Sequence, residues 1–244
     1  MAGKIDGGVR PGDHRSMLDP DPIYRARFAA RLQELKPRSL LDVGCGSGDL
    51  LASMSGQVER MAGIEADGDR IDQARARGLD VRAGAAESLP FDADSFDLVT
   101  FQFVPHHLKA WAPALREALR VARRGVAILE GWYERGIPTQ DVAARYEGWS
   151  KAIDRATGMI HAVYPSAAEL LAPIGSPHRY RIETGYDLVH ALKPYEEVAA
   201  DAEKQLGQLA EPAAAQAELR PILADAQREG FGYEGALTVT ILKP

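Results

Sequence analysis

The sequence contains a single cysteine, Cys45, in 244 residues. One cysteine excludes an internal disulfide framework and fits a reducing compartment. Long apolar runs are absent as well, because no stretch approaches the roughly 18 apolar residues that a membrane-spanning helix needs. The N-terminal residues 1–20 lack the apolar core of a signal peptide. We therefore expect a mobile leader over residues 1–20, a cytoplasmic location and no membrane partner.

Positive charge is also scarce. The chain has 29 Lys and Arg residues against 35 Asp and Glu residues, a formal net charge of −6, and no basic run. Binding to a phosphate backbone depends on clustered Lys and Arg side chains, so the composition argues against a nucleic-acid partner. What is present is a hydrophobic fraction of 45%, which is ample for a packed core.

Short apolar runs alternate with amphipathic stretches up to residue 132. The predicted strands cover residues 39–44, 60–67, 78–84, 95–101 and 124–132, and the predicted helices cover 23–35, a stretch from about 49, 69–77 and 111–122. Strands that alternate with helices pair in parallel through right-handed crossovers. The pattern predicts an α/β fold with a doubly wound, Rossmann-like sheet and helices on both faces.

Beyond Gly131 the alternation breaks. We expect helices over 139–158, 165–173 and 193–209, then an Ala-rich helix with breaks at Pro212 and Pro221. Residues 178–189 are predicted to be extended, and 235–243 to form a last strand, the seventh of a mostly parallel sheet. This predicts one domain over 21–244, with a core at 37–132 and a helical substrate cover at about 133–177 and 190–232.

An apolar stripe marks the first helix of the predicted cover. Its members follow one another at steps of four, three and four: Val142, Tyr146, Trp149 and Ile153. This spacing places them on one face of a helix. The stripe fits either core packing or the wall of a substrate lid, and the sequence leaves both interpretations open.

Three glycines follow the first predicted strand in "LLDVGCGSG", at positions 44, 46 and 48. Without Cβ atoms the chain can turn sharply there, and a ligand can lie against exposed backbone N–H groups. A dinucleotide site favours the spacing G-x-G-x-x-G and needs room for a pyrophosphate, whereas here Asp49 follows Gly48. The spacing therefore disfavours a nicotinamide oxidoreductase.

The glycine segment and three later ones together resemble the ordered motifs of class I S-adenosylmethionine-dependent methyltransferases. The later segments are "GAAESLPFDADSFDLV", "FQFVPHHL" and "LREALRVARRGVAILEG", and the likeness covers residues 37–132. It implies S-adenosylmethionine as cofactor and S-adenosylhomocysteine as product. Two positions depart from the family pattern: Ala85 replaces an adenine-facing Asp, and residues 122–125 replace a Lys-Pro-Gly-Gly turn.

The resemblance also assigns cofactor contacts. Glu65 ends the second strand about 20 residues after the first glycine, which suits a carboxylate that binds ribose hydroxyls. Asp42 is expected to organise the glycine turn near the cofactor's ammonium group. The implied cofactor-binding residues are Asp42, Gly44, Cys45, Gly46, Gly48, Glu65, Ala66, Ala86, Glu87, Phe101, Gln102 and His107.

Methyl transfer from a sulfonium is an in-line displacement, so the enzyme mainly positions the acceptor and excludes water. His106 and His107 are the candidate catalytic bases, although paired histidines in this loop also fit a shaping role. The candidate substrate residues are Glu130, Tyr133, Tyr146, Trp149, His161 and Tyr164. A catechol-type metal site needs Asp and Asn ligands after the fourth strand, and "TFQFVPHHL" has none, so we expect no metal.

These observations predict S-adenosylmethionine-dependent, metal-independent methyl transfer to O or N of a small-molecule metabolite. An alternative is a protein that binds the cofactor without methyl transfer, as a binding module or for a non-methyl reaction. The sequence leaves open the acceptor, the methylated atom and the oligomeric state, a homodimer included.

Overall fold

The structure, a computed structural model, describes residues 20–164 and 166–244, so the predicted leader lies outside the described residues except for Pro20. Its sheet has the strand order β3-β2-β1-β4-β5-β7-β6. The strands are β1 (Ser39–Val43), β2 (Arg60–Glu65), β3 (Val81–Ala83), β4 (Phe96–Gln102), β5 (Ala122–Trp132), β6 (Arg181–Asp187) and β7 (Gly235–Leu242). Strands β1 to β5 pair in parallel, and β7 runs antiparallel to both β5 and β6. The predicted doubly wound, mostly parallel seven-stranded sheet is confirmed.

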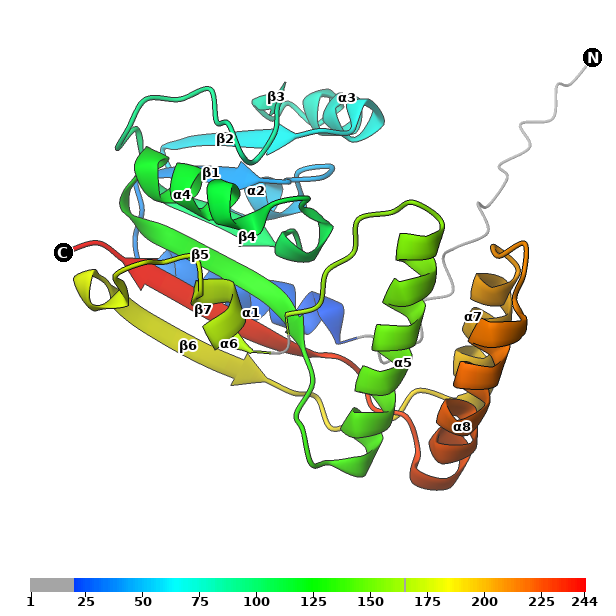
Figure 1. Cartoon of the computed structure of the whole chain (residues 1–244). Helices are drawn as coiled ribbons and strands as arrows, with labels where there is room; N and C mark the ends of the chain where they lie inside the picture. The colour runs from blue at the N-terminus through cyan, green and yellow to red at the C-terminus, as the bar shows by residue number, and fades with distance from the viewer. Residues whose placement is uncertain (1–19, 165) are drawn as a thin grey trace, which may run out of the picture.

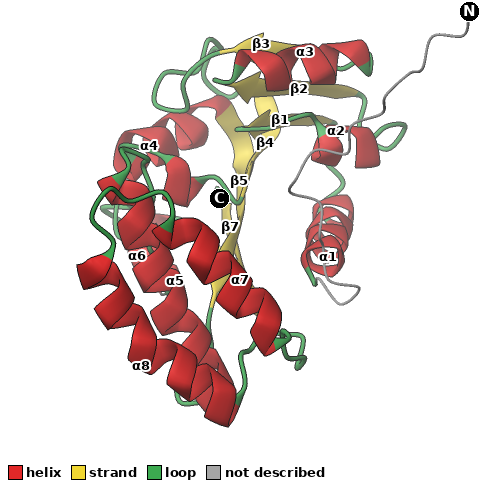
Figure 2. Cartoon of the chain, turned by 90° about the vertical axis from the view of Figure 1, so that its right-hand side faces the viewer, coloured by secondary structure: helices red, strands yellow, loops and turns green. Residues whose placement is uncertain are grey.

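Helices cover both faces of this sheet (Figure 2). One face carries α1 (Asp21–Glu34), α2 (Asp49–Ser53) and α3 (Gly68–Ala76), and the other carries α4 (Trp111–Val121) and α6 (Ala167–Leu171). Successive side chains of a strand point to opposite faces. Leu40 of β1 accordingly packs under the first group of helices, and Leu41 under the second. A central strand with two covered faces therefore needs a continuous apolar run, which is what residues 39–43 supply.

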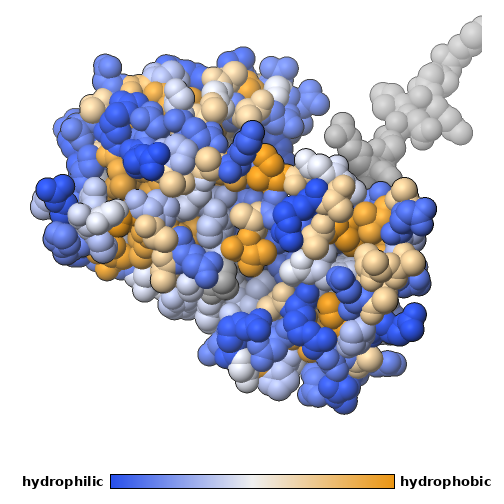
Figure 3. Space-filling view, viewed as in Figure 1, coloured by the Kyte–Doolittle hydropathy of each residue, from blue (hydrophilic) through white to orange (hydrophobic). Residues whose placement is uncertain are grey.

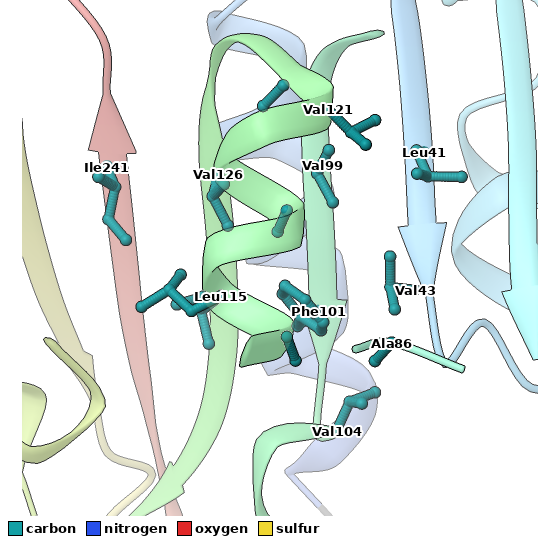
Figure 4. Close-up of a cluster of buried hydrophobic side chains, with 14 of the residues drawn as sticks. Leu41, Val43, Ala86, Val99, Phe101, Val104, Leu115, Val121, Val126 and Ile241 are labelled. Atoms are coloured by element: carbon teal, nitrogen blue, oxygen red, sulfur yellow. The ribbon is translucent and has the colours of Figure 1, made fainter. Parts of the chain in front are cut away.

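Figure 4 shows the core between α4 and the sheet. Leu115 and Val121 of α4 face Val99 and Phe101 of β4 and Val126 of β5, and all five side chains are almost completely buried. This apolar layer fixes α4 across β4 and β5. It thereby fixes the short 3-10 helix η1 (Pro105–His107), which lies between β4 and α4 in the chain.

Three further helices form a separate helical unit beside the sheet (Figure 1). They are α5 (Pro138–Ala156), α7 (Tyr195–Leu206) and α8 (Ala213–Glu229), and they share a hydrophobic cluster of their own. The stripe on α5 lies in this cluster, with Tyr146 and Trp149 only 7% and 5% exposed. The core-packing interpretation of the stripe is therefore the one that the structure supports.

The predicted helix break at Pro221 is wrong. Helix α8 runs from Ala213 to Glu229 with Pro221 inside it, although Pro212 precedes the helix as predicted. A proline inside a helix costs about 3 kcal/mol through a lost hydrogen bond and a steric clash. Leu219 and Ile222, on either side of the proline, are buried in the helical unit. Burial of such side chains contributes about 1.5 to 3 kcal/mol each, which offsets the cost of the proline.

The surface is hydrophilic over much of the face in Figure 3, with hydrophobic atoms exposed near the middle and over the helical unit. Met159, Ile160 and Val163, in the loop that follows α5, are each about half exposed. Within residues 20–164 and 166–244, no helix combines the length and the apolar character that crossing a membrane requires.

The packing of Trp149 gives a first prediction. Its indole Nε1 donates to the carbonyl of Ala215 at 2.9 Å while its ring lies in the helical unit. We expect Trp149→Ala to lower the free energy of unfolding by about 3 to 5 kcal/mol, as measured by urea denaturation. Leu192→Ala, at a side chain that is 53% exposed, is the control and should cost much less. Similar losses in both variants would contradict the packing role of Trp149.

Candidate active site

The turn after β1 depends on glycine. Gly44, Gly46 and Gly48 have backbone φ angles of 69°, 55° and 84°, in the left-handed region that other residues rarely adopt. A Cβ atom on Gly44 would lie 2.6 Å from a methyl group of Val104, and one on Gly48 would lie 2.2 Å from a methyl group of Leu79. The spacing of the motif is therefore required both by the backbone conformation and by close packing.

Glu65 faces this turn from the end of β2. Its Oε2 accepts a hydrogen bond from the amide of Gly46 at 2.8 Å, and its Oε1 accepts from Ala66 at 2.8 Å and Asp67 at 3.0 Å. A Cβ on Gly46 would meet only the tip of the Arg70 side chain, at 3.5 Å. The carboxylate is thus held by three backbone donors at the carboxyl edge of the sheet, beside a part of the turn that is open to a ligand.

Asp42 lies beneath the turn, on β1, and is 2% exposed. Thr100 Oγ1 donates to Asp42 Oδ1 at 2.8 Å. Burial raises the pKa of Asp42 to about 7; the Thr100 hydrogen bond and the charge of Arg25 oppose this rise, and the charge of Glu65 adds to it. Asp42 therefore changes charge near neutral pH, which ordinary aspartates do not.

Arg25 is a site residue that the sequence did not reveal. Its Nη1 donates to Oε1 of Gln102 at 2.6 Å, and its guanidinium lies 4.8 Å from the centre of the Phe103 ring. Helix α1 thus brings a positive charge to the carboxyl end of β4, next to the predicted residue Gln102. The apolar stripe of α1 predicted the helix but gave no signal for this contact, which joins positions 77 residues apart.

Phe101 does not fit its predicted contact with the cofactor. The side chain is fully buried beneath α4 (Figure 4). Its ring lies edge-on to that of Trp111, with 5.1 Å between the ring centres. The reason is strand alternation, because Phe101 points to the face that α4 covers. We therefore correct this prediction and assign Phe101 to the hydrophobic core.

The other predicted cofactor-binding residues differ in whether their side chains or only their backbone atoms are accessible to a ligand. The side chain of Cys45 is buried in the core under α1 to α3, where burial raises the pKa of its thiol. Ala86 is buried in the core under α4, and Glu87 is partly exposed. Ala66 is exposed and meets the carboxylate of Glu65 through its backbone amide. Cys45 and Ala86 are thus limited to backbone contacts with a ligand.

His106 is held in place by a buried carboxylate. Its Nδ1 lies 2.5 Å from Oε1 of Glu130, and Glu130 is 3% exposed on β5. Glu130 also accepts from the amides of His106, at 3.3 Å, and Gly131, at 2.9 Å. A carboxylate that receives Nδ1–H fixes both the tautomer and the orientation of an imidazole. The structure thus joins a predicted catalytic residue with a predicted substrate residue.

His161 joins the same group from the loop after α5. The amide of Ala162 donates to the carbonyl of His106 at 2.8 Å, and His161 Nδ1 lies 2.6 Å from Oδ2 of Asp154. The ring of His161 lies 5.0 Å, centre to centre, from the rings of both His106 and His107. Two adjacent histidines and a third one more than 50 residues later in the sequence therefore lie together at the carboxyl edge of the sheet.

The pKa of His107 is shifted strongly. Burial of its ring and the neighbouring imidazoles of His106 and His161 lower the pKa of His107 to about 4. Burial also lowers the pKa of His161, against the opposing effect of its bond to Asp154. A general base works best with a pKa near the working pH, so His107 is a weaker candidate base than its position in the sequence predicted.

Two more predicted substrate residues are associated with buried acids near this edge. Burial raises the pKa of Tyr133, and the charges of Glu234 and Glu147 raise it further. Burial and the charge of Glu147 also raise the pKa of Glu234 to about 8. Tyr164 packs against the core under α4, where burial and then the charge of Glu130 raise its pKa.

Tyr146 and Trp149 do not join this group. Tyr146 Oη donates to Oδ2 of Asp201 at 2.7 Å, and Trp149 donates to Ala215 on α8. Both side chains are buried among α5, α7 and α8 with their polar atoms paired. We therefore correct the prediction that they contact the substrate, because their packing surfaces and their polar atoms are used within the helical unit.

Comparison with known protein families identifies the core. Residues 41–129, from β1 to β5, match the family described as Methyltransferase domain. The chain is therefore similar to methyltransferases over these residues, which we call the methyltransferase domain. The glycine turn, Asp42 and Glu65 lie within the methyltransferase domain, as does the segment that carries His106 and His107.

Relatives of this methyltransferase domain match only part of the chain. The "Uncharacterized methyltransferase YcgJ" of Bacillus subtilis is 33% identical over 92 residues, which are 35% of this chain and 36% of YcgJ. The ubiquinone/menaquinone biosynthesis C-methyltransferase UbiE of Rhizobium meliloti is 30% identical over 158 residues, which are 59% of this chain and 56% of UbiE. The chain thus spans about a third of the first relative and just over half of the second.

Solved structures extend the likeness in fold beyond the methyltransferase domain. The crystal structure of YcgJ superposes with a TM-score of 0.63 at 17% identity, over 89% of this chain and 98% of the YcgJ chain. The [4+2]-cyclase SpnF superposes with a TM-score of 0.56 at 22% identity, over 92% of this chain and 81% of SpnF. At these identities the likeness concerns the fold alone.

The buried Asp42 predicts a specific dependence of stability on pH. Because its pKa is raised on folding from 3.8 to about 7, the folded protein retains a proton that the unfolded chain releases. The free energy of unfolding should therefore fall by roughly 3 kcal/mol, from this residue alone, as the pH rises from 4 to 7. Asp42→Asn keeps an oxygen acceptor for Thr100 but has no proton to release.

Urea denaturation of both proteins between pH 4 and pH 8 measures this effect. The stability of Asp42→Asn relative to the parent protein should increase with pH and level off above pH 7. A difference that stays constant over this range would show that Asp42 has an ordinary pKa.

Proposed function

We propose that this chain transfers the methyl group of S-adenosylmethionine to an oxygen or nitrogen atom of a small-molecule acceptor. The observation that carries the proposal is the carboxylate of Glu65, held 2.8 Å from the amide of Gly46 beside a turn of three left-handed glycines. The match of residues 41–129 to the methyltransferase family supports the same activity. The cofactor supplies an electrophilic methyl group on a sulfonium.

Residues at the carboxyl edge fit the parts of this cofactor. A carboxylate has about four acceptor positions, and Glu65 uses three of them for backbone amides. A ribose diol would therefore use the remaining position and take the place of one backbone donor. Arg25 provides a positive charge for the cofactor's carboxylate, as charge-assisted hydrogen bonds favour. The ionised form of Asp42 suits the nearby ammonium group.

The acceptor side of the site is proposed around η1. His106, oriented by Glu130, is the proposed base for an acceptor that must lose a proton, and His107 shapes the loop beside it. Tyr133, His161 and Tyr164 are the proposed residues that surround the acceptor. The displacement itself needs no metal, because the cofactor is already activated by its positive sulfur.

The proposed activity assigns one role to the core of the sheet and another to the segments that follow it. Residues 37–132 are the proposed cofactor-binding core, and the segments 133–177 and 190–232 are the proposed cover of the acceptor within one domain. Scarce positive charge supports a metabolite rather than a nucleic acid as acceptor, in the cytoplasm.

A second candidate function is cofactor binding without methyl transfer. The fold is shared with SpnF, which is described as a [4+2]-cyclase. UbiE, in turn, is described as a C-methyltransferase, so its acceptor atom is carbon. A test of the proposed activity must therefore detect methyl transfer and also identify the methylated atom.

Cofactor binding is predicted to depend on Glu65. Glu65→Ala should weaken the binding of S-adenosylhomocysteine by about 1 to 3 kcal/mol through lost charge-assisted hydrogen bonds, which is about 5- to 150-fold in Kd. Titration calorimetry measures this change. Glu59→Ala is the control, since Glu59 pairs with Arg38 at 2.9 Å at the opposite edge of the sheet. Equal affinities in the two variants would contradict the assignment of Glu65.

Methyl transfer is predicted directly. We expect the full-length protein, given methyl-labelled S-adenosylmethionine and a metabolite extract, to label a small molecule on O or N and to release S-adenosylhomocysteine in equal amount. Mass spectrometry identifies the product and the atom, and Glu65→Ala at the same concentrations should reduce the label. Label on carbon would overturn the O or N assignment, and cofactor binding without any labelled product would favour the second candidate function.

A further inference from the structure

The group of His106, His107 and His161 has the arrangement of a set of metal ligands. One ring nitrogen of each histidine lies within 4.8 Å of those of the other two. His106 Nε2 and His107 Nε2 are 3.0 Å apart. We name these three residues the histidine cluster.

Two members of the histidine cluster each contact a carboxylate through one ring nitrogen. Nδ1 of His106 lies 2.5 Å from Oε1 of Glu130, and Nδ1 of His161 lies 2.6 Å from Oδ2 of Asp154. In a neutral imidazole whose Nδ1–H is donated to a carboxylate, the other nitrogen, Nε2, carries the lone pair that a metal ion needs. Metal-bound histidines commonly have such a carboxylate or carbonyl behind them, which fixes the tautomer and strengthens the ligand.

Charges around the histidine cluster also favour a cation. Glu130 and Asp154 contact it directly. The ammonium group of Lys151 faces His161 and opposes a cation there, but it is paired with Glu147 at 3.0 Å. Arg155 Nη1 donates to the carbonyl of His161 at 2.9 Å and adds one more positive charge. The two carboxylates in contact, with Lys151 neutralised by Glu147, still leave an excess of one negative charge around the histidine cluster.

We propose that His106, His107 and His161 bind a divalent transition-metal ion, with Zn²⁺ as the best chemical match. Imidazole nitrogens suit Zn²⁺, Cu²⁺, Fe²⁺ and Ni²⁺, whereas Mg²⁺ and Ca²⁺ prefer oxygen ligands. Three protein ligands leave the fourth position of a tetrahedral ion open, as in catalytic zinc sites. The prediction that no metal is present rested on Asp and Asn ligands after the fourth strand, and it missed a set completed by His161 from another segment.

The present geometry needs only a small adjustment to hold the ion. Tetrahedral Zn²⁺ with bonds of about 2.0 to 2.1 Å requires nitrogens about 3.3 Å apart. The His106 and His107 nitrogens are already at 3.0 Å, so the adjustment falls on His161. His161 lies in the loop after α5, whose neighbouring side chains Ile160 and Val163 are each 47% exposed. The nitrogens lie within 4.8 Å of one another, so the shift needed is at most about 1.5 Å, and surface loops are more mobile than the elements that they connect.

A bound ion changes what His106 can do. Its Nε2 lone pair cannot both bind a metal and accept a proton from the acceptor. With the ion in place, the acceptor's oxygen or nitrogen would occupy the open fourth position, and the ion would lower the pKa of that group. This last step rests on the proposed methyl transfer, but binding of the ion does not.

Metal titration of the full chain tests the proposal. The protein is first treated with a chelator, then titrated with Zn²⁺ by calorimetry and with Co²⁺ by visible absorption, without cofactor or acceptor. We expect one ion per chain and a Co²⁺ spectrum typical of tetrahedral coordination. His161→Ala should weaken Zn²⁺ binding at least 100-fold, while His178→Ala, at an exposed histidine of η2 (Pro177–Arg179), should bind like the parent protein.

A second variant separates ligand orientation from folding. Asp154→Asn should weaken Zn²⁺ binding about 10- to 100-fold, because it removes the charge behind His161 and keeps the size of the side chain. S-adenosylhomocysteine binding should be unchanged in Asp154→Asn, which leaves the proposed function separately testable, and urea denaturation should show that both variants are folded. Folded parent protein that binds no Zn²⁺, or binds it equally well in His161→Ala, would overturn the proposal.

Discussion

The left-handed turn after β1 is the constraint on which the carboxyl edge of the sheet depends. The amides of Gly44 and Cys45 both donate to the carbonyl of Ile64, at 2.7 and 3.1 Å, so the turn is tied to the residue that precedes Glu65. On its other side Gly44 packs against Val104, the residue that precedes η1. The start of this turn therefore links the position of the carboxylate of Glu65 to that of the histidine-bearing segment. A Cβ atom on Gly44 would clash with Val104 and disturb this link.

Desolvation affects the buried acids at the same edge more than their ion pairs do. Asp42 and Glu234 have raised pKa values because desolvation outweighs their favourable contacts. Such groups destabilise the fold when they ionise, and natural proteins keep them mainly where they serve a site. Arg25 and Lys151 are the positive charges that face these acids. The region is thus suited to ligands that carry positive charge, of which a sulfonium cofactor and a metal ion are two kinds.

The regular parts of the fold were predictable because their patterns are local. Apolar runs and helical stripes predicted every strand of the sheet and the helical unit, and the order of motifs located Glu65 at the end of its strand. Phe101 was misassigned because a motif indicates which segment approaches the cofactor, but not which side chains of a strand face the core. The contact of Arg25 with Gln102 and the contact of His161 with His106 and His107 were not predicted, because the partners are distant in the sequence. Such contacts depend on how α1 and the loop after α5 fold back, which periodicity does not encode.

Strand β7 lies between β5 and β6 although it follows both in the sequence. Residues 39–132 can pair among themselves as soon as they are synthesised, whereas β6 meets its sheet neighbour only after residues 235–242 have appeared. Helices α7 and α8 lie in the intervening segment, so β7 closes a long loop that contains them. Because closing such a loop costs chain entropy before its contacts are gained, we expect the part from β1 to β5 to order first. Docking of β6 and of the helical unit then becomes a late, single event governed by the insertion of β7.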